Sequence, residues 1–134
     1  MTGMTAAIIC TAVLAALVFL LGANVSRMRG VAAKAGGPQL PTDPADRLLI
    51  AIRAHGNATE YVPALIVLFL LVGVRGPAMV AIPLIIGATA ARLLHAYGML
   101  TAASVTQATK ARLGGAAATY AFGVGLAVAA AFTV

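Results

Sequence analysis

Residues 53–73 read RAHGNATEYVPALIVLFLLVG, so a polar half stands directly before ten apolar residues. The apolar half is typical of a helix that crosses a lipid bilayer. The whole chain agrees with this, because 62% of its 134 residues are hydrophobic and 9% are charged. A soluble domain has about 25% charged residues. So few charges cannot cover a surface that faces water, which predicts an integral membrane protein.

Four apolar segments are long enough to cross a bilayer at about 1.5 Å per residue. They predict an all-α fold, an integral membrane four-helix bundle that forms a single domain over residues 1–134. A polar segment, SRMRGVAAKAGGPQLPTDPAD, is expected to connect the first two helices, and Asp43 or Asp46 to cap the second. The expected helices cover residues 4–25, 46–74, 77–100 and 110–133.

Basic residues gather at one end of this bundle. Six of them flank the first and third connections, whereas the second connection has only Arg75. The positive-inside rule therefore places the first and third connections in the cytoplasm and both termini outside. The six are Arg27, Arg29, Lys34, Arg47, Lys110 and Arg112.

Polar residues also lie within the apolar helices. Arg53, Asn57 and Glu60 have spacings that place them on one helix face, and His55 points nearly the opposite way. Arg92, on the third helix, lies at a matching depth of about 10–12 Å from the cytoplasmic end. A charge at the helix centre costs about 2.5–3.5 kcal/mol to insert, so such residues pair with one another or line a cavity.

Two interpretations of these charges are open. In the first, they form a structural network in which Glu60 offsets one arginine and Asn57 accepts a hydrogen bond. In the second, they bind a ligand, because Arg53 and Arg92 are two cations against one carboxylate. The count favours the second interpretation. It predicts a polar, net-anionic ligand held between helices near the cytoplasmic face.

Several other classes of function are disfavoured. No basic cluster is interleaved with aromatic residues and Trp is absent, so nucleic acid is not an expected partner. His55 and His95 lie on different helices without a third ligand, so no metal site is expected. The first helix has no carboxylate, which disfavours a small proton-coupled transporter. Cys10 is the only cysteine and is expected to be a buried thiol.

The segment RAHGNATEYVP at 53–63 resembles the helix-2 signature of the MAPEG family, the membrane-associated proteins in eicosanoid and glutathione metabolism. The family pattern is close to R-x-x-x-N-x-x-E-Y-x-P. RLLHAYG at 92–98 and NVSRMR at 24–29 are similar to the family's helix-3 segment and to the end of its first helix. The resemblance implies a bacterial-type member in the bacterial inner membrane. It also implies a homotrimer that binds glutathione, a net-anionic ligand, between neighbouring subunits.

The resemblance also implies roles for individual residues. Arg53 would hold a carboxylate of glutathione, Asn57 would bond to its peptide, and Glu60 would take its γ-glutamyl ammonium. Arg112, with Lys110 as a rival, would lower the pKa of the thiol, which is about 8.5 for a free thiol. The thiolate would attack a lipophilic electrophile from the bilayer or reduce a lipid hydroperoxide. The remaining contacts implied are Arg27, His55, Tyr61, Arg92, His95 and Tyr97.

Three departures from the family pattern bear on catalysis. The spacing from Tyr97 to Arg112 is longer than in the leukotriene-synthase branch, and no Ser or Tyr directly follows Arg112. His55 stands where some members have Gln. Two functions therefore remain open. We favour a glutathione transferase or peroxidase, and the alternative is a non-catalytic lipid-binding or scaffold protein on the same fold.

Overall fold

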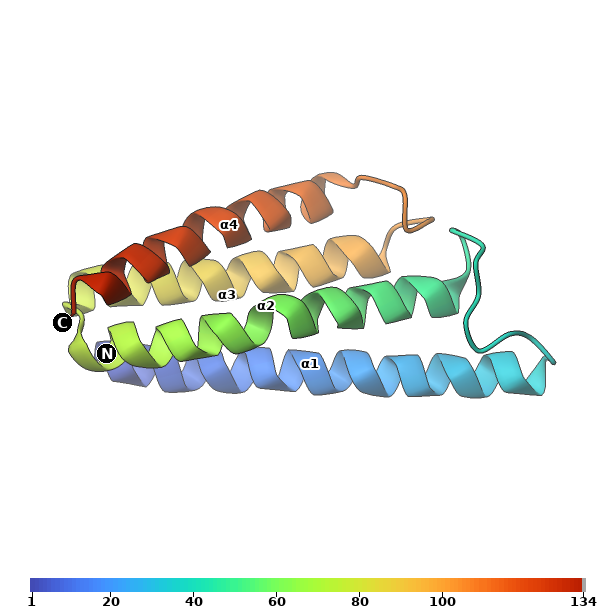
Figure 1. Cartoon of the computed structure of the whole chain (residues 1–134), viewed down its shortest axis with the longest axis horizontal. Helices are drawn as coiled ribbons and strands as arrows, with labels where there is room; N and C mark the ends of the chain where they lie inside the picture. The colour runs from blue at the N-terminus through green and yellow to red at the C-terminus, as the bar shows by residue number, and fades with distance from the viewer. Residues whose placement is uncertain (134) are drawn as a thin grey trace.

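The computed structural model describes residues 1–133 and contains four helices and no strand within them. All four helices are long and apolar enough to cross a membrane. The predicted all-α membrane bundle is therefore confirmed, and its association into a trimer stays a prediction. The helices are α1 (Gly3–Lys34), α2 (Arg47–Arg75), α3 (Ala78–Leu100) and α4 (Lys110–Ala131) (Figure 1).

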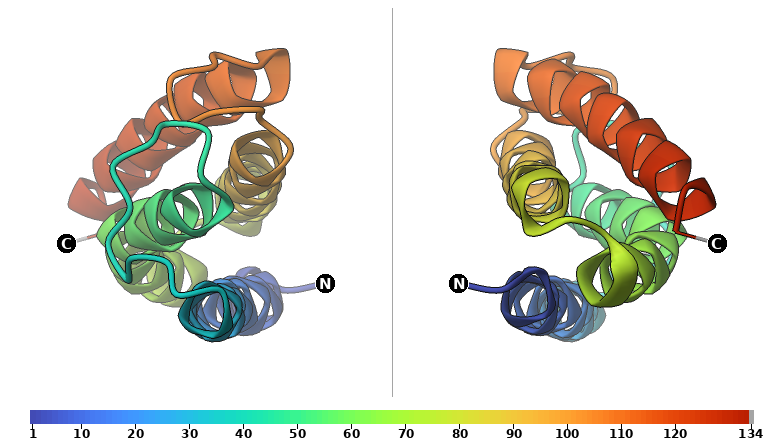
Figure 2. Two further views of the ribbon diagram at one scale, coloured as in Figure 1. Left: turned by 90° about the vertical axis from the view of Figure 1, so that its right-hand side faces the viewer. Right: turned by 90° about the vertical axis from the view of Figure 1, so that its left-hand side faces the viewer.

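The helices form two antiparallel pairs. α1 packs chiefly on α2 and α3 chiefly on α4, while α1 and α4 do not touch within residues 1–133. Figure 2 shows α1 and α4 on opposite sides of the bundle, with α2 and α3 between them. The connections at 35–46 and 101–109 lie at one end, here called the loop end (Figure 1). Both termini and the α2–α3 turn lie at the other end, called the terminal end.

α1 is longer than the sequence analysis predicts. The apolar stretch ends at Val25, but the helix continues to Lys34, so the predicted connection from residue 26 is wrong. The helix ends where Gly36 adopts a φ of 68°. The amides of Gly36 and Gly37 donate to carbonyls of the last turn at 3.1 and 2.8 Å. Glycine takes this left-handed conformation without steric cost, so the Gly36-Gly37 pair sets the end.

The other helix bounds agree with the prediction to within two residues. Asp46 caps α2, because its carboxylate accepts from the amides of Leu48 and Leu49 at 2.7 and 3.4 Å. Asp43 instead accepts from the amide of Ala45 in the preceding turn. The choice between the two aspartates is therefore settled in favour of Asp46.

Two glycines bring α3 and α4 into close contact near the loop end. A Cβ on Gly98 would collide with the backbone of Arg112, and a Cβ on Gly115 would collide with the backbone of His95. Backbones approach this closely only where side chains are small. The contact fixes the start of α4 against α3, and it therefore determines where Arg112 and His95 lie.

Candidate functional site

Arg92 is the most deeply buried charged side chain in the described chain, with 1% of its surface exposed. Its guanidinium donates to the side-chain Oδ1 of Asn57 at 2.7 Å and, at 3.4 Å, to the Asn57 carbonyl. Its Nε is buried and has no hydrogen-bond partner among residues 1–133. The bonded oxygens are neutral, so the charge of Arg92 is hydrogen-bonded but not neutralised by them.

Two tyrosines extend this arrangement toward α4. The guanidinium carbon of Arg92 lies 5.1 Å from the ring centroid of Tyr61, which is a cation–π distance. The Tyr61 hydroxyl donates to the hydroxyl of Tyr120 at 3.4 Å, and the ring centroids are 5.9 Å apart. We call Asn57, Tyr61, Arg92 and Tyr120 the arginine cluster. The sequence analysis missed Tyr120, although it is the only tyrosine in α4.

His95 links α3 to the start of α4. Its Nδ1 lies 2.9 Å from the main-chain oxygen of Arg112. A carbonyl only accepts, so Nδ1 carries the proton and donates. The other ring nitrogen, Nε2, is buried and has no partner within the described residues. His95 is therefore held in one orientation, one helical turn from Arg92.

Arg112 braces the connection between α3 and α4. Its guanidinium donates to the carbonyls of Val105 and Gln107 at 2.7 and 3.1 Å. Its own amide donates to Thr109, which caps α4. Lys110, the rival residue, is exposed at the first position of the helix. Arg112 is thus half-buried and fixed, whereas Lys110 projects from the bundle.

Arg53 and Glu60 lie on the outer face of α2. Both side chains are exposed, whereas Ala54, Ala58 and Val62 on the opposite face are buried in the bundle. On a single chain, Arg53 and Glu60 face lipid, which is unfavourable for charged groups. Charged residues in membrane helices usually pair with other polar groups or line a cavity.

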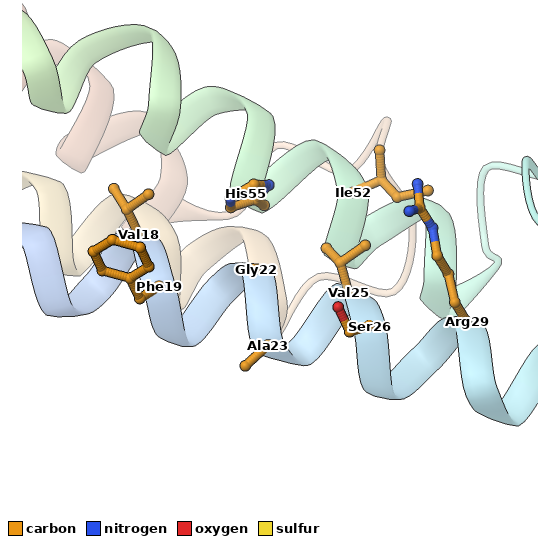
Figure 3. Close-up of a pocket in the computed structure, with 9 residues that line it drawn as sticks. All are labelled: Val18, Phe19, Gly22, Ala23, Val25, Ser26, Arg29, Ile52 and His55. Atoms are coloured by element: carbon orange, nitrogen blue, oxygen red, sulfur yellow. The ribbon is translucent and has the colours of Figure 1, made fainter.

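His55 points away from the arginine cluster and toward α1. It lies over Gly22, where an added Cβ would come within 3.2 Å of its Nε2. Arg29 and Ser26 of α1 line the same groove, whose volume is about 530 Å³. Figure 3 shows Arg29 reaching from α1 toward α2 on the side where His55 points down to α1. We call this the His55 groove.

Arg27 and Tyr97 do not join either group. Arg27 donates to Asn24 at 2.9 Å and lines a different groove, together with Arg47 and Leu100. Tyr97 is 62% exposed on the outside of α3. The helix-1 cation that shares a groove with His55 is Arg29, which the sequence analysis considered only for its charge at the rim.

An apolar groove leads away from the two tyrosines between α2 and α4. Its volume is about 250 Å³. It is open along the side of the bundle, at the level of the apolar helix segments. It therefore offers space for a lipophilic molecule beside the arginine cluster. The residues that line it include Tyr61, Leu65, Leu68, Thr119, Tyr120 and Val124.

Comparison with known families identifies the chain. The model of the MAPEG family matches residues 7–132, which include almost all of the four helices. The chain belongs to the MAPEG family. It is thus a multi-pass membrane protein of a family associated with eicosanoid and glutathione metabolism. Comparisons of this MAPEG protein with curated proteins and with solved structures gave no significant match.

Proposed function

We propose that this MAPEG protein is a membrane-bound glutathione transferase with peroxidase activity toward lipid hydroperoxides. The observation that carries the proposal is the buried, unneutralised Arg92, bonded to Asn57. Arg53 and Glu60 lie on the adjoining outer face of α2. Two cations and one carboxylate complement a ligand with two carboxylates and one ammonium. Glutathione has these groups.

Arg92 acts as a positioning residue. Because the Oδ1 of Asn57 accepts from Arg92, Asn57 presents its NH₂ donors to the ligand. In the proposal these donors bond to a peptide carbonyl of glutathione. Arg53 holds a carboxylate and Glu60 the γ-glutamyl ammonium. Tyr61 and His95 form the wall next to them.

The proposed site lies between subunits of a homotrimer. Arg53 and Glu60 are on the outer face of α2, whereas His55 and Arg29 line the groove toward α1. One chain cannot turn both sets toward one ligand, but the His55 groove of a neighbouring copy can face Arg53. We propose three copies because the family resemblance implies a homotrimer. In this arrangement Arg29, rather than Arg27, is the helix-1 cation at the site.

The proposed chemistry is activation of the glutathione thiol. Arg112 lies in the first turn of α4, where the helix dipole adds positive potential. A nearby cation favours the thiolate, so the thiol releases its proton to water. The sulfur then bonds to an electrophilic carbon as the leaving group departs. With a hydroperoxide, two glutathione molecules are oxidised to the disulfide, and the products are an alcohol and water.

Orientation and substrate entry follow from the same arrangement. The six basic residues near the loop end support a cytoplasmic loop end, with both termini outside, because the positive-inside rule favours that orientation. For a bacterial member the membrane is the inner membrane. Glutathione reaches the site from the cytoplasm, and the lipophilic substrate reaches it through the apolar groove between α2 and α4.

Thiolate formation tests the enzyme proposal. Purified protein in detergent is titrated with glutathione while thiolate is followed by ultraviolet difference absorbance. We expect saturable thiolate in the wild type, its loss in Arg112→Ala with binding retained, and loss of binding in Arg53→Ala. Arg75→Ala, at the terminal end, is the matched control and should behave as the wild type. Thiolate that survives Arg112→Ala but not Lys110→Ala would transfer the role to Lys110.

One observation favours the non-catalytic alternative. The Arg112 guanidinium already donates to two carbonyls of the connection before α4. If this bracing is its whole role, glutathione binds without forming thiolate, and no electrophile in a panel is turned over. The protein would then hold a ligand or a lipid on the same fold. No binding of glutathione at all would contradict the enzyme proposal and leave the lipid-binding or scaffold alternative.

Mixing of subunits tests whether the site is shared. Arg53→Ala and His55→Ala each remove one half of the proposed site. Chains carrying one change or the other are co-expressed with different affinity tags and purified as mixed assemblies. Each mixed trimer then joins two intact halves at one of its three sites, so binding should return to about a third of the wild-type level. No recovery in verified mixed assemblies would mean that each site lies within one chain.

A further inference from the structure

A second basic groove lies at the loop end of the bundle, where α1, α2 and α3 meet. Arg27 enters it from α1 and Arg47 from the first position of α2. Its volume is about 450 Å³. It is distinct from the His55 groove, which lies between α1 and α2 alone. Arg27, which the family resemblance implies as a glutathione contact, lines this groove instead of the His55 groove, and no other polar residue of the proposed glutathione site lines it.

The side chain of each arginine in this groove makes one hydrogen bond within the described residues. Arg27 donates to the side-chain oxygen of Asn24 at 2.9 Å, and Arg47 donates to the carbonyl of Ala102 at 3.3 Å. Both acceptors are neutral, and none of the residues among 1–133 that line the groove carries a carboxylate. A guanidinium has five N–H donors, so most donors of both side chains remain available. The groove therefore holds two positive charges that favour an anion.

Apart from the amide of Asn24, the remaining lining is apolar. Met28, Ile50, Ala51 and Leu100 form it, and Leu100 is the last residue of α3. The groove thus lies where the helices leave the apolar layer, with two cations and an amide next to hydrocarbon. A small soluble anion would leave that hydrocarbon surface uncovered. A phospholipid matches both parts, because its phosphate joins directly to glycerol and acyl chains.

We propose that this groove binds the headgroup of an anionic phospholipid from the leaflet at the loop end. Arg27 and Arg47 contact the phosphate, for which a guanidinium offers paired donors. Met28, Ile50 and Leu100 contact the glycerol and the first methylene groups. Basic pockets between membrane helices on the cytoplasmic side bind anionic headgroups in this way. The proposal does not depend on glutathione binding.

The terminal end provides an internal comparison. Two apolar grooves there are lined by Arg75 as their only cation. Basic residues from two different helices converge on the groove at the loop end, whereas the charge at the terminal end is single. If charge near the membrane surface were the only requirement, both ends would retain anionic lipid. The proposal expects retention at the loop end only.

Native mass spectrometry of the full chain in detergent tests the proposal. The protein is titrated with dioleoyl phosphatidylglycerol or dioleoyl phosphatidylcholine, and bound lipid is counted. We expect phosphatidylglycerol to be preferred. The double variant Arg27→Gln/Arg47→Gln should bind it about thirtyfold more weakly, as two cations near the lipid surface imply. Arg27→Gln alone, at an exposed residue that leaves the fold intact, should lose about fivefold.

A matched double variant separates this site from diffuse charge. Lys34→Gln/Lys110→Gln removes two cations from the same end, both exposed and outside the groove. It should retain phosphatidylglycerol as the wild type does. Equal loss in the two double variants, or equal binding of the two lipids by the wild type, would overturn the proposal. Displacement of the lipid by millimolar inorganic phosphate would also overturn it, because the groove would then be a free-phosphate site.

Discussion

Arg53 and Arg92 carry the same charge and both lie in helices long and apolar enough to cross a membrane, but their surroundings are opposite. Arg92 is buried by α2, α3 and α4, bonded to Asn57 and covered by the ring of Tyr61. Arg53 is exposed on the outer face of α2. The environment of Arg92 is complete within one chain, and that of Arg53 is not. In the proposed function, Arg92 organises the site and Arg53 binds the ligand.

Replacement of Arg92 is expected to have the largest effect, and it tests the contrast between the two arginines. Arg92→Ala leaves a cavity and an unpaired Asn57 oxygen in the bundle, so we expect a loss of about 2–5 kcal/mol in stability. The midpoint of thermal unfolding in detergent should fall clearly. Arg53→Ala, at an exposed position, should change it by less than about 0.5 kcal/mol. Equal destabilisation by the two variants would contradict the assignment of different roles.

The contact that holds the helix of Arg92 against α4 gives the next largest effect. Gly115→Ala places a methyl group against the backbone of His95, and overpacking of this kind costs about 1–3 kcal/mol. Gly114→Ala is the matched control, because a Cβ there meets nothing within 4 Å. It should be neutral or stabilising by up to about 1 kcal/mol. Thermal unfolding of the two variants side by side checks this, and similar midpoints would contradict the close approach.

Arg53 should matter for the ligand instead. Loss of a charge-assisted hydrogen bond to a carboxylate weakens binding by about 1.5–2 kcal/mol, which is at least tenfold. Arg53→Ala should therefore raise the dissociation constant for glutathione, measured by equilibrium dialysis, and leave the unfolding midpoint almost unchanged. Arg53→Lys keeps the charge and should recover part of the affinity. Unchanged binding in Arg53→Ala would remove Arg53 from the site.

Replacement of Tyr120 is expected to have the smallest effect on stability and on ligand affinity. It tests whether the Tyr120 hydroxyl contacts the ligand. The bond between the two tyrosine hydroxyls is long, at 3.4 Å, and Tyr120 is 55% exposed. Tyr120→Phe should thus cost less than about 1 kcal/mol in stability. Its effect on glutathione affinity should be no more than about threefold. A tenfold loss of affinity would show that the hydroxyl itself contacts the ligand.

Much of the fold follows from the sequence, because apolar length and helical periodicity are local properties. Four spans and the opposite directions of His55 and Asn57 need no tertiary information, and the sequence limited the cap of α2 to Asp43 or Asp46. The end of α1 was misplaced because an apolar window marks the extent of the bilayer rather than the end of a helix. The helix continues to Lys34 as long as nothing interrupts it.

The contacts within the candidate site were harder to predict from the sequence. Residues 26–34 were expected to form a connection, so helical periodicity was not applied to them, and Arg29 was not assigned to the side of His55. The distance of each arginine from the cytoplasmic end of its helix predicted that Arg92 lies level with Arg53. The hydrogen bond of Arg92 is instead to Asn57, one turn farther along α2. Tyr120 approaches Tyr61 only because α4 packs near α2. Such contacts depend on how helices cross, which sequence spacing does not specify.

The length of α1 affects how glutathione and a lipophilic substrate would reach the proposed site. Its 32 residues extend about 48 Å, well beyond the hydrocarbon layer of about 30 Å. The connection to α2 therefore departs from a point more than one turn past Arg29, so it does not begin at the mouth of the His55 groove. The turns of α1 beyond Arg29 keep the start of the connection away from the His55 groove. They leave the His55 groove open to water for the peptide ligand of the proposed function, while the side of the bundle stays open to the proposed lipophilic substrate from the bilayer.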